Sequence, residues 1–267
     1  MLVASDLDRT LIYSRGAFGL PEGHGVELVC VEHYDGGPLS YLTAGSARLV
    51  AELVQAAVFV PVTTRTRAQL ARVELPGLTA RYAIAANGGF LLEDGHPDVG
   101  WSRQVSETLA ATSAPLDEIW AHLQDVCTPA FTHTLRRAEE LFAYAVTERT
   151  TIPAGFVDEL STWAGMRGWS TSLQGRKLYL VPVGLKKSVA VAEVARRVGA
   201  GTVLAAGDSL LDADLLLAAD LAIRPAHGEL AESGLSAPHL HVTRQHGVLA
   251  GEEIAAWLLA TTRGRVG

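Results

Sequence analysis

Short apolar runs recur along the chain, and each ends at a polar or glycine-led loop. Four of them have the length and composition of buried strands, and they span residues 2–5, 57–62, 82–86 and 202–206. The residues that follow these runs are Asp6, Thr63, Asn87 and Gly207. Two shorter runs, at 221–223 and 239–242, are candidates for further strands.

Helical periodicity separates these strands. In segments 45–55 and 187–198, apolar residues recur at the spacing of an amphipathic helix. Strands that alternate with helices predict an α/β fold with a parallel sheet. In open sheets of this class ligands bind at the carboxyl ends of the strands, which is where the polar residues fall.

A different pattern occupies residues 88 to about 180. It predicts two helices that follow prolines, one strand with alternating apolar residues, and a hairpin around Gln174 and Gly175. In chain order these segments are helix 116–126, strand 141–148, helix 156–165 and hairpin 169–182. The mixture predicts an α+β insert.

The alternation of strands and helices resumes after this insert, so we expect one domain to interrupt another. The predicted core comprises residues 1–86 and 183–267, and the predicted inserted domain comprises residues 87–182. A smaller excursion at residues 26–43 has the pattern of a hairpin that turns at residues 35–37 and overhangs the first strand.

Composition narrows the classes of partner. The 267 residues, 48% of them hydrophobic, suffice for a packed core, and the net charge of −7 leaves no basic excess for nucleic acid or an anionic membrane. No run approaches the about 20 apolar residues of a membrane helix, and Asp6 precedes any stretch long enough for a signal peptide. We therefore expect a cytoplasmic protein with a small-molecule partner. Cys30 and Cys127 are too isolated for a disulfide framework or a zinc knuckle, so we expect reduced thiols.

Two carboxylates, Asp6 and Asp8, follow the first strand directly. On their own, such acids often cap a helix or face solvent. Three further segments change this interpretation, namely VTTR at 62–65, KSVAVAEV at 187–194 and GDSLLD at 207–212. Taken in order, the four segments resemble the four sequence motifs of the haloacid dehalogenase superfamily.

The first two motifs of that superfamily end strands. DLDRT at residues 6–10 matches the first motif, DxDxT, in its place after an N-terminal strand. Thr63 fills the Thr or Ser position of the second motif. Thr64 stands where Gly is common in that motif, and Arg65 stands where Arg is common.

The third motif is a lysine that begins a helix. Lys186 and Lys187 both qualify by position. Lys187 is preferred because the apolar residues among 190–194 then fall at the helical offsets of the usual pattern.

The fourth motif, GDxxxD or GDxxND, is met by Asp208 and Asp212. Leu211 stands where Asn is frequent, so one contact near the metal differs from the usual pattern. Asp214 lies two residues further along, and we expect it to be a helix-surface charge.

The position of the insert, between the second and third motifs, resembles that of the C2 cap in the Cof-like group. This group includes sucrose-phosphate and mannosyl-3-phosphoglycerate phosphatases. Residues 87–95 are similar to the entry into that cap, and residues 175–188 are similar to its exit. The resemblance implies a Rossmann-like parallel sheet core with an inserted α+β C2-type cap domain.

The resemblance also implies an activity. A Mg²⁺-dependent phosphatase would hydrolyse a small phosphorylated metabolite, a phosphosugar or related phosphate monoester, through an aspartyl-phosphate on Asp6. Asp8 would protonate the departing alcohol and then activate water. Because an ordinary Asp has a pKa near ~3.9, we expect nearby negative charge to raise the pKa of Asp8.

Ligands for the metal and the phosphate follow from the same motifs. Mg²⁺ would be held by Asp6, the backbone carbonyl of Asp8 and Asp208. Asp212 would either bind the ion through water or hold Lys187 in place. The phosphate would contact the ammonium of Lys187, the hydroxyl of Thr63 and the loop N–H groups near Leu7 and Thr64.

Four further side chains have expected roles other than nucleophile or acid. Thr10 would tie down the loop, and Arg9 would be solvated or face the cap. Arg65 would either reach the phosphate or pair with a core carboxylate. Arg176, next to Lys177, would either face the cleft and hold a second anionic group of the substrate or remain outside it.

Several other activities share parts of this pattern of residues. A phosphotransferase or phosphomutase would use the same nucleophile, and a catalytically weak phosphometabolite-binding protein would keep the same site. A true dehalogenase needs neither a second acid nor a metal, so Asp8 and Asp208 argue against that activity. Zinc binding is disfavoured for His239, His241 and His246 because no cysteine or second motif accompanies them. A dinucleotide site is unsupported because no GxGxxG opens a helix after a strand.

Overall fold

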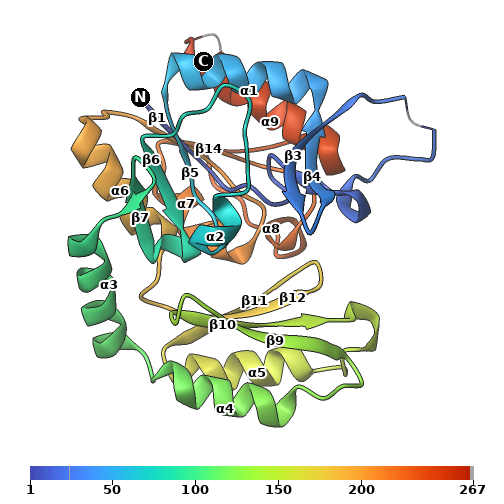
Figure 1. Ribbon diagram of the computed structural model, residues 1–267, viewed down its shortest axis with the longest axis vertical. Helices are drawn as coiled ribbons and strands as arrows, with labels where there is room; N and C mark the ends of the chain where they lie inside the picture. The colour runs from blue at the N-terminus through green and yellow to red at the C-terminus, as the bar shows by residue number, and fades with distance from the viewer. Residues whose placement is uncertain (24, 265–267) are drawn as a thin grey trace. The chain divides into compact units, whose positions relative to one another are not determined.

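The computed structural model describes residues 1–23 and 25–264 (Figure 1). The chain divides into two compact units, one formed by Met1–Pro97 with Lys187–Gly267 and the other by Asp98–Lys186. The expected domain boundaries lay after residues 86 and 182. The structure divides after residues 97 and 186. The first boundary falls later than expected because residues 87–97 continue a sheet that begins with the strand at Tyr82–Ala85.

A five-stranded parallel sheet forms the centre of the first unit, which confirms the predicted fold class. Its strands, in spatial order, are β15 (Leu240–Val242), β14 (Leu221–Arg224), β13 (Val203–Ala206), β1 (Leu2–Ser5) and β5 (Val58–Pro61). In the middle of the sheet Ala4 pairs with Ala205 on one side and with Val60 on the other. The four residues of β1 are buried, as expected for a strand covered on both faces.

The run at 82–86 does not extend this ladder. Strand β6 (Tyr82–Ala85) pairs instead with β7 (Phe90–Glu93), and β7 pairs with β8 (His96–Pro97), to form an antiparallel sheet. A single parallel bridge from Val62 to Ile84 links β6 to the strand before it.

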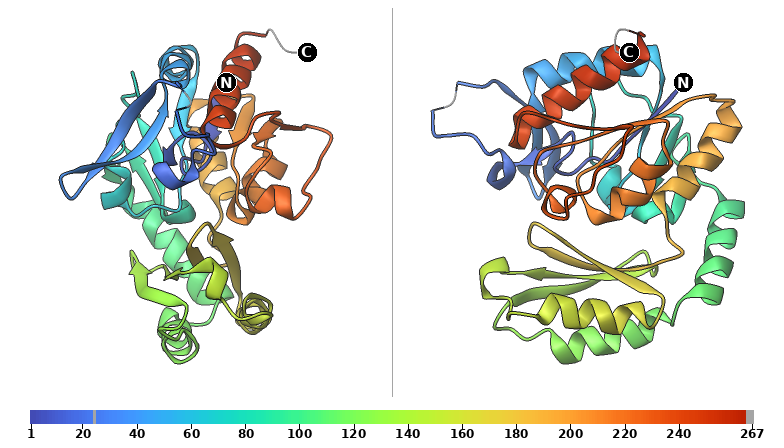
Figure 2. Two further views of the ribbon diagram at one scale, coloured as in Figure 1. Left: turned by 90° about the vertical axis from the view of Figure 1, so that its right-hand side faces the viewer. Right: turned by 180° about the vertical axis from the view of Figure 1, so that it is seen from behind.

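Helices cover the parallel sheet. Helix α1 (Ala44–Ala56) packs against α9 (Gly247–Thr262), and α6 (Lys187–Val198) packs against α7 (Ala213–Ala218), as Figure 2 shows. Thr43 caps α1 because its side chain accepts a hydrogen bond from the N–H of Ser46. Two helices of one turn, α2 (Arg67–Leu70) and α8 (Glu229–Glu232), lie in loops.

The predicted hairpin at 26–43 is present in the first unit. Strand β3 (Leu28–Tyr34) pairs with β4 (Gly37–Thr43), and the short strand β2 (Tyr13–Ser14) pairs with the other edge of β4. Asp35 and Gly36 form the turn with φ values of 51° and 75°, the left-handed backbone that a two-residue hairpin turn requires.

The second unit is an α+β domain. Its antiparallel sheet has the order β11 (Trp169–Gln174), β12 (Lys177–Pro182), β10 (Phe142–Thr147) and β9 (Thr132–Ala138). Helices α4 (Leu116–Val126) and α5 (Phe156–Gly165) cover one face of it (Figure 2), and α3 (Val99–Thr112) precedes them. Both helices and the hairpin β11–β12 confirm the pattern-based predictions. Within residues 1–23 and 25–264, no helix combines the length and the apolar character needed to cross a membrane.

Candidate active site

The first strands of the parallel sheet bring the predicted residues together. Asp6 follows β1, Thr63 lies two residues beyond β5, and Asp208 lies two residues beyond β13. Because parallel strands have their carboxyl ends at one edge, these side chains share that edge. The N–H of Asp6 donates to the carbonyl of Ala206 at 2.9 Å, which continues the β1–β13 ladder into the site.

Lys187 is the cation at the centre of this edge. Its side chain is 0% exposed, and Nζ donates to Asp6 Oδ1 at 2.7 Å and to Asp212 Oδ1 at 2.5 Å. Burial alone would lower the pKa of this ammonium, but the carboxylates of Asp212 and Asp6 outweigh burial and raise it. Lys187 is the first residue of α6, whereas Lys186 is exposed.

Several carboxylates share this buried space with one lysine. Burial raises the pKa of Asp6 to about 7, although the ammonium of Lys187 acts against it. Burial also raises the pKa of Asp208 well above its ordinary value, and the charges of Asp6 and Asp212 add to the rise. A further cation beside these groups would therefore stabilise their ionised forms.

The donor set suits a hard divalent cation. Asp6, Asp208 and Asp212 each offer an oxygen, and these oxygens lie within 4.8 Å of one another. Within residues 1–23 and 25–264, this is the one group of three or more His, Cys, Asp or Glu side chains with such spacing. Carboxylate oxygens without a thiolate or imidazole are the ligands that Mg²⁺ prefers, so the residues fit that ion.

Asp212 differs from the other two acids because its side chain is 0% exposed and accepts four hydrogen bonds from protein groups. Oδ1 accepts from Lys187, while Oδ2 accepts from the N–H of Ser209 at 2.9 Å, from its hydroxyl at 2.7 Å and from the N–H of Asp208 at 3.2 Å. This arrangement fits a residue that holds Lys187 and the loop at Asp208 and Ser209 in place. Leu211, where Asn is frequent in the family pattern, is buried and offers no oxygen.

Asp8 lies outside the buried acid group. Its side chain is 42% exposed and forms a two-point ion pair with Arg65, with Nε to Oδ2 at 2.7 Å and Nη2 to Oδ1 at 2.8 Å. Arg65 also contacts Glu32, with Nη1 to Oε1 at 2.8 Å. Of the two roles left open for Arg65, pairing with core carboxylates is the one that the structure contains.

Thr63 and Thr64 are both buried where the chain leaves β5. The hydroxyl of Thr63 accepts from the N–H of Arg65 at 3.1 Å, and its carbonyl accepts from the N–H of Asn87 at 2.9 Å. These bonds orient the hydroxyl within the loop, and that hydroxyl keeps a proton to donate.

Arg9 was expected to be solvated or to face the cap, and the structure adds a contact that this expectation did not include. Its side chain is 36% exposed, and Nε lies 3.3 Å from Asp208 Oδ2. The backbone of Arg9 is left-handed, with φ of 61°. Its carbonyl accepts from Nε2 of His227 at 3.0 Å, while Nδ1 of that ring accepts from the N–H of Gly247 at 3.2 Å. The second bond assigns the ring proton to Nε2.

Two smaller groups complete the loop contacts. The hydroxyl of Thr10 donates to Asp6 Oδ2 at 3.4 Å, which agrees with a loop-tying role. Asp214 is not simply a helix-surface charge, because its Oδ2 accepts from the N–H of Ser188 at 2.9 Å and so caps the helix that Lys187 begins.

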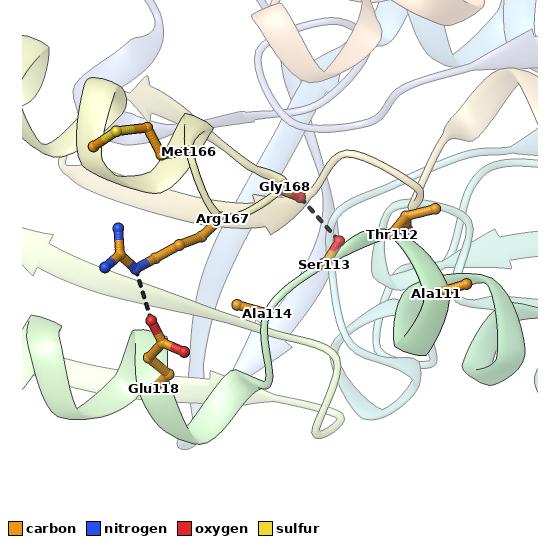
Figure 3. A pocket seen from close by; sticks show the side chains of 8 residues that line it. All are labelled: Ala111, Thr112, Ser113, Ala114, Glu118, Met166, Arg167 and Gly168. Atoms are coloured by element: carbon orange, nitrogen blue, oxygen red, sulfur yellow. Dashed lines mark hydrogen bonds and ion pairs between the residues drawn. The ribbon is translucent and has the colours of Figure 1, made fainter.

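The second unit contains a hollow between helices. Its volume is about 550 Å³, and its lining comes from α3, α4 and the segments that follow α3 and α5. In Figure 3, Arg167 donates to Glu118 at 2.7 Å, and the hydroxyl of Ser113 donates to the carbonyl of Gly168 at 2.9 Å. Its polar groups therefore bond to one another, and none of the predicted site residues lines it. Arg176 also belongs to the second unit, and its expected contact with substrate stays a prediction.

Comparisons with solved structures identify the fold. The sucrose-phosphatase of Synechocystis sp. PCC6803, in complex with sucrose and phosphate, superposes with a TM-score of 0.65 over 97% of each chain at 15% identity. The chain has the haloacid dehalogenase fold. A subclass IIB sugar phosphatase of that superfamily gives a TM-score of 0.61 over 99% of each chain at 12% identity. A trehalose-6-phosphate phosphatase related protein gives 0.57 over 99% of this chain and 100% of its own at 17% identity.

Comparisons by sequence add nothing to this assignment. No family model matches the chain, and no curated protein matches it. The resemblance inferred from four short motifs is therefore confirmed through the fold, at identities between 12% and 17%.

Proposed function

We propose that the protein is a Mg²⁺-dependent phosphatase that hydrolyses a small phosphorylated metabolite, a phosphosugar or related phosphate monoester. The observation that carries the proposal is the contact between Lys187 and Asp6 at 2.7 Å, beside Asp208 at the carboxyl edge of the sheet. The proposal is supported by a buried carboxylate, a buried lysine and two further acids that lie close together at this edge.

Asp6 is the nucleophile in this proposal. One of its carboxylate oxygens forms a bond to phosphorus while the bond from phosphorus to the ester oxygen breaks. Lys187 holds the carboxylate in one orientation and adds positive charge where the anionic phosphoryl group would otherwise be repelled. A bound Mg²⁺, held by Asp6 and Asp208, would supply further charge neutralisation for the phosphoryl oxygens.

Asp8 is the acid and base of the reaction. Its half-exposed carboxyl group, after taking up a proton from solvent, donates that proton to the departing alcohol, so that a neutral alcohol leaves. In the second step it accepts a proton from water as the water oxygen bonds to phosphorus and the bond to Asp6 breaks. Inorganic phosphate is released and Asp6 is regenerated.

The substrate class is supported by the named activities of the structural neighbours. They are sugar phosphatases, and one of them was solved with sucrose and phosphate bound. We therefore infer a phosphorylated sugar or polyol for this chain as well.

A panel of sugar and polyol phosphates tests the proposal, with inorganic phosphate as the measured product. We expect turnover with Mg²⁺, and loss of turnover with EDTA or in the Asp6→Asn variant. Equal release of alcohol and phosphate distinguishes hydrolysis from transfer to a second alcohol. Undiminished turnover in Asp6→Asn, or binding without turnover across the panel, would overturn it.

A further inference from the structure

Glu32 is a buried carboxylate that the proposed mechanism does not use. It lies on strand β3 of the hairpin, and its side chain is 0% exposed. Oε2 accepts from the hydroxyl of Ser40 at 2.6 Å. Oε1 contacts Nη1 of Arg65 at 2.8 Å and Nη2 of Arg72 at 3.1 Å. This buried carboxylate bonds to two arginines and one hydroxyl, and it acts as a fixed anchor for them.

Arg65 connects this anchor to the edge of the sheet. Nε and Nη2 face Asp8, while Nη1 faces Glu32. The remaining two N–H groups reach Ser40 Oγ at 3.3 Å and the carbonyl of Gln69 at 3.5 Å. All five N–H donors of the guanidinium therefore have protein partners, and the group has no donor to spare for a substrate phosphate.

The geometry of a guanidinium makes this connection directional. The group is planar, so the partner on one edge sets the direction of the others. Glu32 thereby fixes the plane in which Arg65 presents two N–H groups to Asp8. Asp8 is a half-exposed side chain on a loop, and these two N–H groups bond to both of its carboxylate oxygens.

We propose that Glu32 is a positioning residue for the phosphatase reaction, acting through Arg65 to hold Asp8 in line with the departing alcohol. The proposal rests on the proposed function and extends the active site to the β3–β4 hairpin. A poor leaving group needs a proton from Asp8 as its bond to phosphorus breaks, whereas a phenol with electron-withdrawing substituents leaves as an anion. Misplacing Asp8 therefore slows the two classes of ester unequally.

The Glu32→Gln variant tests this through kcat/KM for two classes of ester, alkyl phosphates and p-nitrophenyl phosphate. General acid catalysis contributes about 100-fold or more, so we expect alkyl esters to lose roughly 30-fold or more and the aryl ester less than about 3-fold. Glu93→Gln is the matched control, because Glu93 also receives two arginines, Arg81 and Arg197, but lies on β7. Glu93→Gln should lower kcat/KM for neither class of ester.

Arg65→Lys is the second variant, because it keeps the positive charge between two carboxylates but cannot bond to both in one plane. Circular dichroism and thermal unfolding verify that each variant folds. We expect Arg65→Lys to show the same unequal loss, so it tests the proposal even if Glu32→Gln does not fold. Equal losses for both esters, or no loss for either, would overturn the positioning role. A wild-type protein that cleaves no ester would overturn the proposed function itself, and that result appears before any variant is made.

Discussion

Lys187 and Asp212 form an ion pair in which neither side chain is exposed, with Nζ 2.5 Å from Oδ1. The same ammonium contacts Asp6, so one lysine neutralises part of a buried group of acids. Removing one partner of a buried pair leaves an uncompensated charge, which costs more than the pair itself contributes. The lysine is therefore as important for folding as for the proposed chemistry.

Substituting Lys187 with Met tests this dual role. We expect the free energy of unfolding to fall by about 3–5 kcal/mol, because Asp6 and Asp212 lose their shared cation. Urea denaturation followed by circular dichroism measures the change. The exposed neighbour provides the control, and Lys186→Met should stay within roughly 0.5 kcal/mol of wild type. Similar losses in the two variants would contradict the assignment.

Arg9 and a metal ion would both interact with Asp208. Because the guanidinium lies 3.3 Å from Oδ2, its charge opposes a divalent ion at the same carboxylate. We expect Arg9→Gln to bind Mg²⁺ about tenfold more tightly by isothermal titration calorimetry, the direction that Coulomb repulsion requires. Arg48→Gln, on the exposed side of α1, should leave the affinity unchanged. Unchanged or weaker binding in Arg9→Gln would rule out this competition.

Gly228 makes room for Asp208. A Cβ at this position would lie 2.6 Å from the carbonyl oxygen of Asp208 and 2.7 Å from its Oδ2, and φ is 89°. We expect Gly228→Ala to destabilise the fold by about 1–3 kcal/mol more than Gly199→Ala in urea unfolding. Gly199 also has a positive φ, 62°, and nothing lies within 4 Å of its Cβ, so Gly199→Ala measures the cost of a positive φ without a close neighbour. Equal costs would show that Asp208 is not held by this close approach.

His227 predicts a pH dependence of stability. Burial lowers its pKa from 6.5 to about 4 in the folded protein. Between these values the unfolded chain binds a proton that the folded chain does not. The stabilising contribution is therefore complete above about pH 6.5 and is lost as the pH falls toward 4.

The variant His227→Gln removes this titration. Its free energy of unfolding should decline less than that of wild type between pH 6.5 and 4, measured by urea unfolding at several pH values. His133→Gln, at an exposed position of β9, should retain the wild-type slope. Parallel slopes for wild type and His227→Gln would refute the role of this ring.

Sequence patterns predicted the amphipathic helices and the short buried strands. The helices α1, α4 and α6 each bury one stripe, and the strands of the parallel sheet are short apolar runs that end at polar residues. Helix α9 escaped prediction because it is apolar around most of its circumference, so its buried residues show no clear period. Strand β9 escaped because its sequence, THTLRRA, is mostly polar and partly exposed.

The candidate site divides in the same way. Acids placed directly after strands could be assigned from position, because the carboxyl ends of parallel strands converge. The link from Glu32 through Arg65 to Asp8 joins residues far apart in the chain, and no local pattern signals such a contact. The left-handed backbone of Arg9 had no signal in the sequence either, because Arg rarely adopts a positive φ.

The central claim is that Asp6 takes the phosphoryl group, and the most direct measurement is the site of the covalent intermediate. The protein is mixed with p-nitrophenyl phosphate and Mg²⁺, quenched in acid and reduced with borohydride, which converts an aspartyl-phosphate to homoserine. Peptide mass spectrometry should then find homoserine at position 6 in wild type and none in Asp6→Asn. Homoserine at Asp8 or elsewhere, or rapid ester cleavage with no modified residue, would contradict the account.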